Sequence, residues 1–363
     1  MSNAEKKNRF EYLDILEFIA IFLVISCHGT TYNFDFIKES APIYYVRYFL
    51  RSLASASVPL FFFINGYLLF NRELNLKKHL YKTLRLAVLT VIWAIISVLV
   101  MMPIQHEAMT VKGFLVRVWG MSDNWLWYMG TLVGIYILFP ILKSTYDYSE
   151  KCFRYFVIIC AVMTFGNRLI CNVMTVAAHS LINYPNVIKM NVFNAFNPFQ
   201  GIYWYDFVYF CGGGLIYKYI PRIMEKLKKL TVISAIALPI SMALLTLWGV
   251  YVSRLNAEVW DNTWGGFDTI FTPVMVLAMF IISLNYNPQN KTIKKTVETV
   301  SKNTLGLYLI HELYILPTVE FVRGIDIARN IPGDILYTIC IVSVCMATIW
   351  LIKKIPVVKK LLV

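Results

Sequence analysis

Residues 83–103 read TLRLAVLTVIWAIISVLVMMP, an apolar run whose one charged side chain is Arg85. At a rise of 1.5 Å per residue, a helix of this length spans about 30 Å, the thickness of the hydrocarbon core of a bilayer. Comparable runs recur along the chain, so we expect an all-α integral membrane protein with about ten transmembrane helices. The predicted helices cover residues 12–31, 48–70, 83–103, 125–142, 154–171, 202–220, 231–253, 267–285, 303–322 and 334–352.

The composition favours the same class of protein. Of the 363 residues, 58% are hydrophobic and 15% are charged, whereas about 25% of the residues of an average soluble chain are charged. One soluble core of this size cannot bury so much apolar surface. No linker or soluble domain is evident, so residues 1–363 are predicted to form a single membrane domain.

The basic residues predict the orientation of the chain. Cytoplasmic loops retain Lys and Arg, and 24 of the 34 basic residues fall in alternate connections if both termini are cytoplasmic. This distribution, with anionic lipids as the attracting partners, explains the net charge of +13. A nucleic-acid partner is therefore not expected.

Polar residues within the apolar runs are the candidate functional residues, because ionisable groups are costly inside a membrane. The run at 12–31 contains Asp14, Glu17 and His28. Glu17 and His28 lie about 20° apart around a helix and about 16 Å apart along it, with Asp14 on the same face. This stripe indicates a polar cavity, although two acids in the headgroup region and a structural histidine would give the same pattern.

The run at 303–322 contains a second polar face. Tyr308, His311 and Glu312 recur there at helical spacing. His311 either joins His28 across a shared cavity or forms hydrogen bonds that hold helices together. Asn65, Trp127 and Tyr128 are further candidates for the substrate cavity, together with Tyr308 and Glu312. Taken alone, Asn65 indicates a packing site and the aromatic residues an interfacial belt.

The order of these segments resembles a known family. An Asp and then a His in the first apolar run are followed by VPLFFFINGYLL from residue 58, NWLWYMGTLVGIYILFPIL from 124, FVYFCGGGLIYKY from 207 and NTLGLYLIHE from 303. This ordered combination, over residues 10–322, resembles the bacterial acyltransferase-3 family. Its members are plasma-membrane acyltransferases that modify surface glycans and related acceptors.

The resemblance implies roles for particular residues. His28 matches the histidine regarded as catalytic, Asp14 the acid that opens the same helix, and Tyr308 and His311 a later Tyr-x-x-His. Glu17 departs from the family, since many members have an arginine there. Tyr81 also departs, standing at the first arginine of an Arg-x-x-x-Arg pair of which Arg85 is retained. The missing arginines are thought to help bind the acyl donor.

The expected donor is acyl-CoA, with acetyl-CoA as the first choice, and the expected acceptor is a glycan or lipid-linked glycan. The polyanionic donor would meet cations on the cytoplasmic side, although the positive-inside rule alone would also place them there. These cations are Arg72, Lys77, Lys78, Lys82 and Arg85.

Acyl transfer to a hydroxyl needs a base, and a histidine suits this role near neutral pH. His28 is the predicted base, with Asp14, Glu17 or His311 as its orienting partner. A transient acyl-histidine is a rival mechanism. No zinc-ligand spacing is apparent in the sequence, so no metal cofactor is expected. The alternative function is a multi-pass transporter or exporter of a glycan or small molecule, for which a polar cavity is equally ordinary.

Overall fold

The computed structural model describes residues 10–29, 35–39, 41–104, 110–120, 125–193, 204–325 and 330–356, which contain helices and no strand. Seven helical segments among them are long and apolar enough to cross a membrane. The expectation of an all-α membrane protein is therefore confirmed. The elements are α1 (Glu11–His28), α2 (Pro42–Ser52), η2 (Leu53–Ala56), α3 (Ser57–Phe70), α4 (Leu76–Ile104), α5 (Val111–Gly120), α6 (Trp127–Tyr148), α7 (Glu150–Ala161), η4 (Val162–Gly166), α8 (Asn167–Ile182), α9 (Trp204–Glu225), α10 (Leu227–Asn256), η6 (Trp264–Gly266), α11 (Phe271–Ser283), α12 (Lys291–Ser301), α13 (Thr304–Arg323) and α14 (Ile331–Lys354).

Each predicted apolar run contains helix within the described residues. Residues 30–31 and 202–203 of the predicted helices, and both ends of the chain, lie outside the described part. Three helices that match predicted runs are not among the seven long apolar segments, namely α1, α9 and α11. α1 contains three carboxylates within 18 residues, and α11 has 13 residues.

Three predicted runs differ in detail from the helices of the structure. The run at 48–70 is divided by the 3-10 turn η2, and the run at 154–171 belongs to a longer helix with a π-helical segment, η4, at its middle. The run at 267–285 begins as a helix only at Phe271. There the hydroxyls of Thr269 and Thr272 donate to the Gly266 carbonyl at 2.8 and 2.7 Å, which stabilises a turn in place of the first helical turn.

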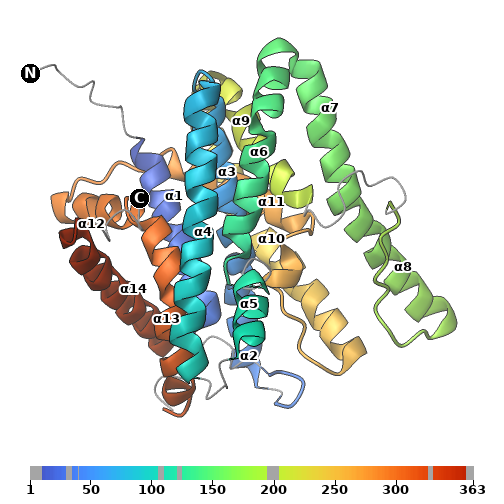
Figure 1. Cartoon of the computed structure of the whole chain (residues 1–363). Coiled ribbons are helices and arrows are strands. Elements are labelled where there is room, and N and C mark those ends of the chain that lie inside the picture. Colours follow the sequence, from blue (N-terminus) through green and yellow to red (C-terminus); the bar gives the residue numbers. More distant parts are fainter. Residues whose placement is uncertain are drawn as a thin grey trace, which may run out of the picture.

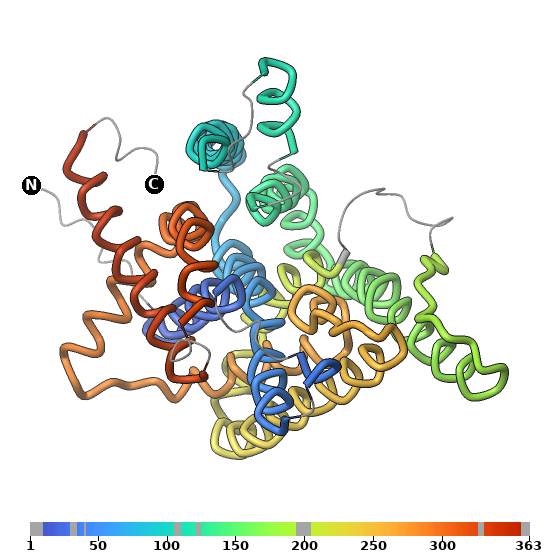
Figure 2. The backbone as a smooth tube through the Cα atoms, turned by 90° about the horizontal axis from the view of Figure 1, so that it is seen from below, coloured from blue at the N-terminus to red at the C-terminus, as the bar shows by residue number. Residues whose placement is uncertain are grey.

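The helices form a bundle with α3 at its centre. Figure 2 shows α3 surrounded, with α4 and α6 on one side and α13 and α14 on another. The connections from α3 to α4 and from α6 to α7 lie at the top of the bundle in Figure 1, and α12 lies along its left side. Basic residues that the charge pattern assigns to the cytoplasm lie in the first connection, in the helices on either side of the second, and on α12.

Close packing of α3 against α9 depends on glycine. A Cβ added at Gly66 would lie 1.7 Å from the Phe210 carbonyl oxygen, and one added at Gly213 would lie 2.0 Å from the Phe63 carbonyl oxygen. Contacts this short leave no room for any side chain at either position. Such small residues let helix backbones approach closely in membranes, where lipid gives no hydrophobic driving force for helix association.

The triple glycine of α9 offers a matched comparison. Gly213→Ala is expected to destabilise the protein by about 1–3 kcal/mol, because the added methyl group overpacks a backbone contact. At Gly212 an added Cβ meets nothing within 4 Å, so Gly212→Ala is expected to be neutral or slightly stabilising. Thermal unfolding of both variants in detergent measures the difference. Equal melting temperatures for the two would contradict this account of the α3–α9 contact.

Candidate active site

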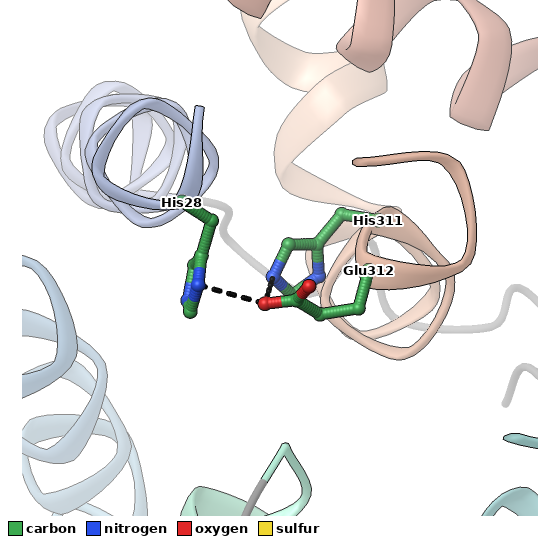
Figure 3. A group of neighbouring side chains, drawn as sticks. All are labelled: His28, His311 and Glu312. Atoms are coloured by element: carbon green, nitrogen blue, oxygen red, sulfur yellow. Dashed lines mark ion pairs between the residues drawn. The ribbon is translucent and has the colours of Figure 1, made fainter. Parts of the chain in front are cut away.

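A histidine and a carboxylate from distant parts of the chain meet in a pair. Nδ1 of His28, the last residue of α1, lies 2.7 Å from Oε1 of Glu312 on α13 (Figure 3). The His28 side chain is 22% exposed and that of Glu312 is 11% exposed. When Nδ1–H donates to the carboxylate, Nε2 is left with its lone pair. A carboxylate that holds an imidazole in this way is typical of histidine bases.

His311 adds a second imidazole to the pair. Its ring centroid lies 5.4 Å from that of His28, and its side chain is buried. His311 Nδ1 lies 2.6 Å from the Tyr308 carbonyl oxygen. Because a carbonyl can only accept, Nδ1 must carry the proton and Nε2 the lone pair. Nε2 lies 3.9 Å from Glu312 Oε1 and has no hydrogen-bond partner within the described part of the chain.

A cavity of about 360 Å³ opens beside these histidines. Its size falls within the usual range for small-molecule sites, about 300–1,000 Å³. The His28 ring packs edge to face against Trp264, with ring centroids 5.4 Å apart. The walls are mostly aromatic, and the lining residues are Val24, His28, Val58, Trp125, Trp127, Tyr205, Trp264, Phe267, Tyr308 and His311.

A buried arginine fixes the end of α1 that carries His28. Arg51 Nη1 donates to the Cys27 carbonyl at 3.1 Å, and its Nη2 donates to Asp261 Oδ2 at 2.9 Å. The first bond satisfies a carbonyl that the helix end leaves without an intrahelical donor. The second connects α1 to the segment between α10 and α11, which also supplies Trp264 to the cavity. Arg51 therefore holds His28 in place relative to the cavity wall.

A polar layer lies next to the cavity. Tyr136 donates its hydroxyl to Asn65 Oδ1 at 3.0 Å, and Asn65 Nδ2 donates to the Tyr128 hydroxyl at 3.2 Å. The Tyr128 ring lies 5.3 Å from that of Tyr308, which lines the cavity and donates its hydroxyl to the Trp125 carbonyl at 2.7 Å. Of the predicted cavity residues, Trp127 and Tyr308 line the cavity directly. Tyr128 and Glu312 contact residues of its wall, Tyr308 and His28, and Asn65 is hydrogen-bonded to Tyr128.

The acids of α1 lie away from His28. Ser301, at the end of α12, donates its hydroxyl to Asp14 Oδ1 at 2.8 Å and also contacts Glu17 Oε2. Along the helix, Glu17 is about 16 Å from His28, and Asp14 is further away. The partner that orients His28 in the structure is Glu312, with His311 alongside. Asp14 and Glu17 instead connect α1 to α12.

The predicted donor cations lie at the start of α4 and just before it. Lys78, Lys82 and Arg85 are exposed and share one face of the helix, being four and three residues apart. Arg72 is also exposed. The Lys82 ammonium lies 5.2 Å from the centroid of the Tyr136 ring. This contact joins the cationic face of α4 to the polar layer of Asn65 and Tyr128.

Two features of the site were not predicted from the sequence. Trp264 lies between the predicted helices at 231–253 and 267–285, and Phe267 is the first residue of the second run, so only a concentration of aromatic residues marks them. Asp206, in the first turn of α9, is fully buried, and neither of its carboxyl oxygens has a hydrogen-bond partner within the described residues. Its neighbour Tyr205 lines the cavity. As the one acid of the run at 202–220, Asp206 was detectable from the sequence.

These features describe a helical membrane protein with a carboxylate-bound histidine at an aromatic cavity. The family model for the acyltransferase domain of the acyltransferase-3 family matches residues 10–353. The chain therefore belongs to this family of membrane acyltransferases. No curated protein and no solved structure matches it.

Proposed function

We propose that the protein is an O-acyltransferase of the bacterial plasma membrane. It moves an acyl group, acetyl in the first instance, from cytoplasmic acyl-CoA to a hydroxyl of a surface glycan or its lipid-linked precursor. The observation that carries this proposal is the 2.7 Å contact between His28 Nδ1 and Glu312 Oε1 beside the aromatic cavity. Membership of an acyltransferase family supplies the type of reaction.

In the proposed reaction His28 is the general base. Nε2 takes the proton of the acceptor hydroxyl as the hydroxyl oxygen attacks the thioester carbonyl carbon. The tetrahedral intermediate then expels the CoA sulfur, which recovers the proton from Nε2, so the products are an ester and CoA. Glu312 stabilises the imidazolium that exists between these two transfers and keeps its ring oriented. The aromatic walls of the cavity provide flat apolar faces suited to a sugar ring.

The cations of α4 are proposed to bind the phosphates of the donor. Lys82→Gln with Arg85→Gln is expected to raise the KM for acyl-CoA about tenfold, equivalent to about 1.4 kcal/mol, with a smaller effect on kcat. Because these side chains are exposed, the effect should weaken at high salt. Lys228→Gln with Lys229→Gln is a matched control, since both lysines are exposed and lie at the start of α10. An equal rise in KM for the control pair would show that only general surface charge matters.

The proposed function is tested by transfer of radiolabelled acetyl from acetyl-CoA to the lipid and glycan fraction of membranes from the native host. Membranes that contain the protein should form labelled product, and otherwise identical membranes without it should not. Label released by alkaline hydroxylamine identifies an oxygen ester. If the stably inserted protein forms no labelled product with either acetyl-CoA or longer acyl-CoA donors, the transporter becomes the favoured function.

A further inference from the structure

His311 offers a lone pair that the proposed reaction does not use. Its Nδ1–H is bound to the Tyr308 carbonyl, its side chain is 2% exposed, and its Nε2 has no hydrogen-bond partner among the described residues. Figure 3 shows this nitrogen directed at the same Glu312 oxygen that contacts His28. A buried nitrogen of this kind is costly to leave unbound, and a neutral imidazole nitrogen is a common ligand of metals.

The three side chains form a compact set of donors. One ligand atom from each of His28, His311 and Glu312 can be chosen so that all lie within 4.8 Å of one another. In a tetrahedral zinc site, bonds of about 2.1 Å place the ligands about 3.4 Å apart. Side-chain shifts of about 1 Å or less would bring the donor atoms from their present separations to those of a zinc site. Two imidazoles and one carboxylate with a fourth position open to the cavity are a ligand set that zinc accepts.

We propose that His28, His311 and Glu312 bind a divalent transition-metal ion of the zinc class, and that this ion inhibits the enzyme. The three ligands come from α1 and α13, which is why sequence spacing did not indicate the site. The ion is not a cofactor of the proposed reaction. It occupies the position between the histidines and Glu312 and prevents the reaction from starting.

The inhibition follows from the proton on His28, and this part of the inference rests on the proposed function. To bind the ion through Nδ1, His28 must give up the proton that it shares with Glu312. The neutral ring then carries its proton on Nε2, the nitrogen that faces the acceptor in the proposed reaction. His28 has no lone pair left to accept the hydroxyl proton, and Glu312 is held by the ion as well. Transfer therefore stops while the metal is bound.

Cobalt(II) is the probe for binding, because tetrahedral Co²⁺ absorbs visible light strongly and zinc displaces it. The full-length protein, purified in detergent and freed of metal with a chelator, is expected to bind one Co²⁺ with a tetrahedral spectrum. His311→Gln should weaken binding by more than about 100-fold, since loss of even an outer-shell partner costs about 10- to 100-fold. His179→Gln is the control, because His179 lies in α8 and is not a lining residue of the cavity, and it should bind as wild type does.

Two further measurements keep the proposal open to refutation if His311→Gln fails to fold. Electron paramagnetic resonance of Cu²⁺ bound to wild type should show two nitrogen ligands, and a signal without nitrogen ligands would overturn the site. In the acetyl-transfer assay, micromolar Zn²⁺ should abolish transfer and excess chelator should restore it. Transfer that is insensitive to zinc would overturn the inhibition.

The outcomes separate the two proposals. A protein that binds Co²⁺ through these residues but never forms labelled product supports the metal site and contradicts the acyltransferase function. A protein that transfers acetyl but binds Co²⁺ with the same affinity in wild type and His311→Gln contradicts the metal site alone.

Discussion

Replacing His28 with alanine should lower acetyl transfer by about 10²- to 10⁴-fold, the usual contribution of a positioned general base. The expected loss is in kcat, because the cations proposed to bind the donor phosphates lie on α4 and the cavity keeps its aromatic walls. His28→Gln should be as inactive, since an amide has no lone pair on a basic nitrogen. The measurement is the initial rate of label transfer at saturating acetyl-CoA, with protein amounts equalised by immunoblot.

The control for this loss is His179→Ala, which removes an imidazole from α8, away from the cavity. It should retain the wild-type rate. A His28→Ala protein that melts like wild type and transfers at the wild-type rate would exclude His28 from the reaction. If label instead accumulates on wild-type protein and is absent from His28→Ala, the acyl-histidine mechanism replaces general-base catalysis.

Glu312→Gln should also lower kcat, by about 10²- to 10⁴-fold, because loss of the carboxylate partner of a catalytic histidine is costly in related arrangements. Glutamine keeps the size of the side chain, and its amide oxygen can still accept from Nδ1–H of His28. It lacks the negative charge that stabilises the imidazolium. The KM for acetyl-CoA should change little, since the cations of α4 are untouched.

Combining Glu312→Gln with His28→Ala should cost little more than His28→Ala alone. Residues that act as one unit are not additive, because a partner has no role once the base is gone. Glu320→Gln is the matched control on the same helix, where the exposed carboxylate pairs with Arg323 at 2.9 Å. Additive losses in the double variant would show that Glu312 and His28 act independently.

Much of the fold was predictable because the bilayer imposes a strong rule on sequence. A spanning helix must be predominantly apolar over about 20 residues, and each run predicted on this basis contains a helix. Apolar character does not predict where a helix begins when side chains bond to the backbone. The hydroxyls of Thr269 and Thr272 donate to the Gly266 carbonyl, and α11 begins only after this turn. The rule is also silent about amphipathic helices that lie outside the long apolar segments, such as α12 and α5.

The site was predictable only in part. Helical geometry placed Asp14, Glu17 and His28 on one face of α1, but angular agreement does not bring together residues about 16 Å apart along the axis. The partner that meets His28 comes from α13 and is 284 positions away in the chain. Contacts between helices depend on which faces pack, and no periodicity within a single helix records that. The sequence therefore predicted Glu312 as a residue of the substrate cavity but did not predict its contact with His28.

The walls of the cavity give the protein an internal optical reporter. Trp125, Trp127 and Trp264, three of the nine tryptophans, line the space beside His28. An acceptor that enters this space displaces water from three indole rings, so the colour and intensity of tryptophan emission should respond to binding alone. Candidate glycans can then be screened with unlabelled ligand and no acyl donor. Trp264→Phe would identify how much of the signal comes from the ring that touches His28.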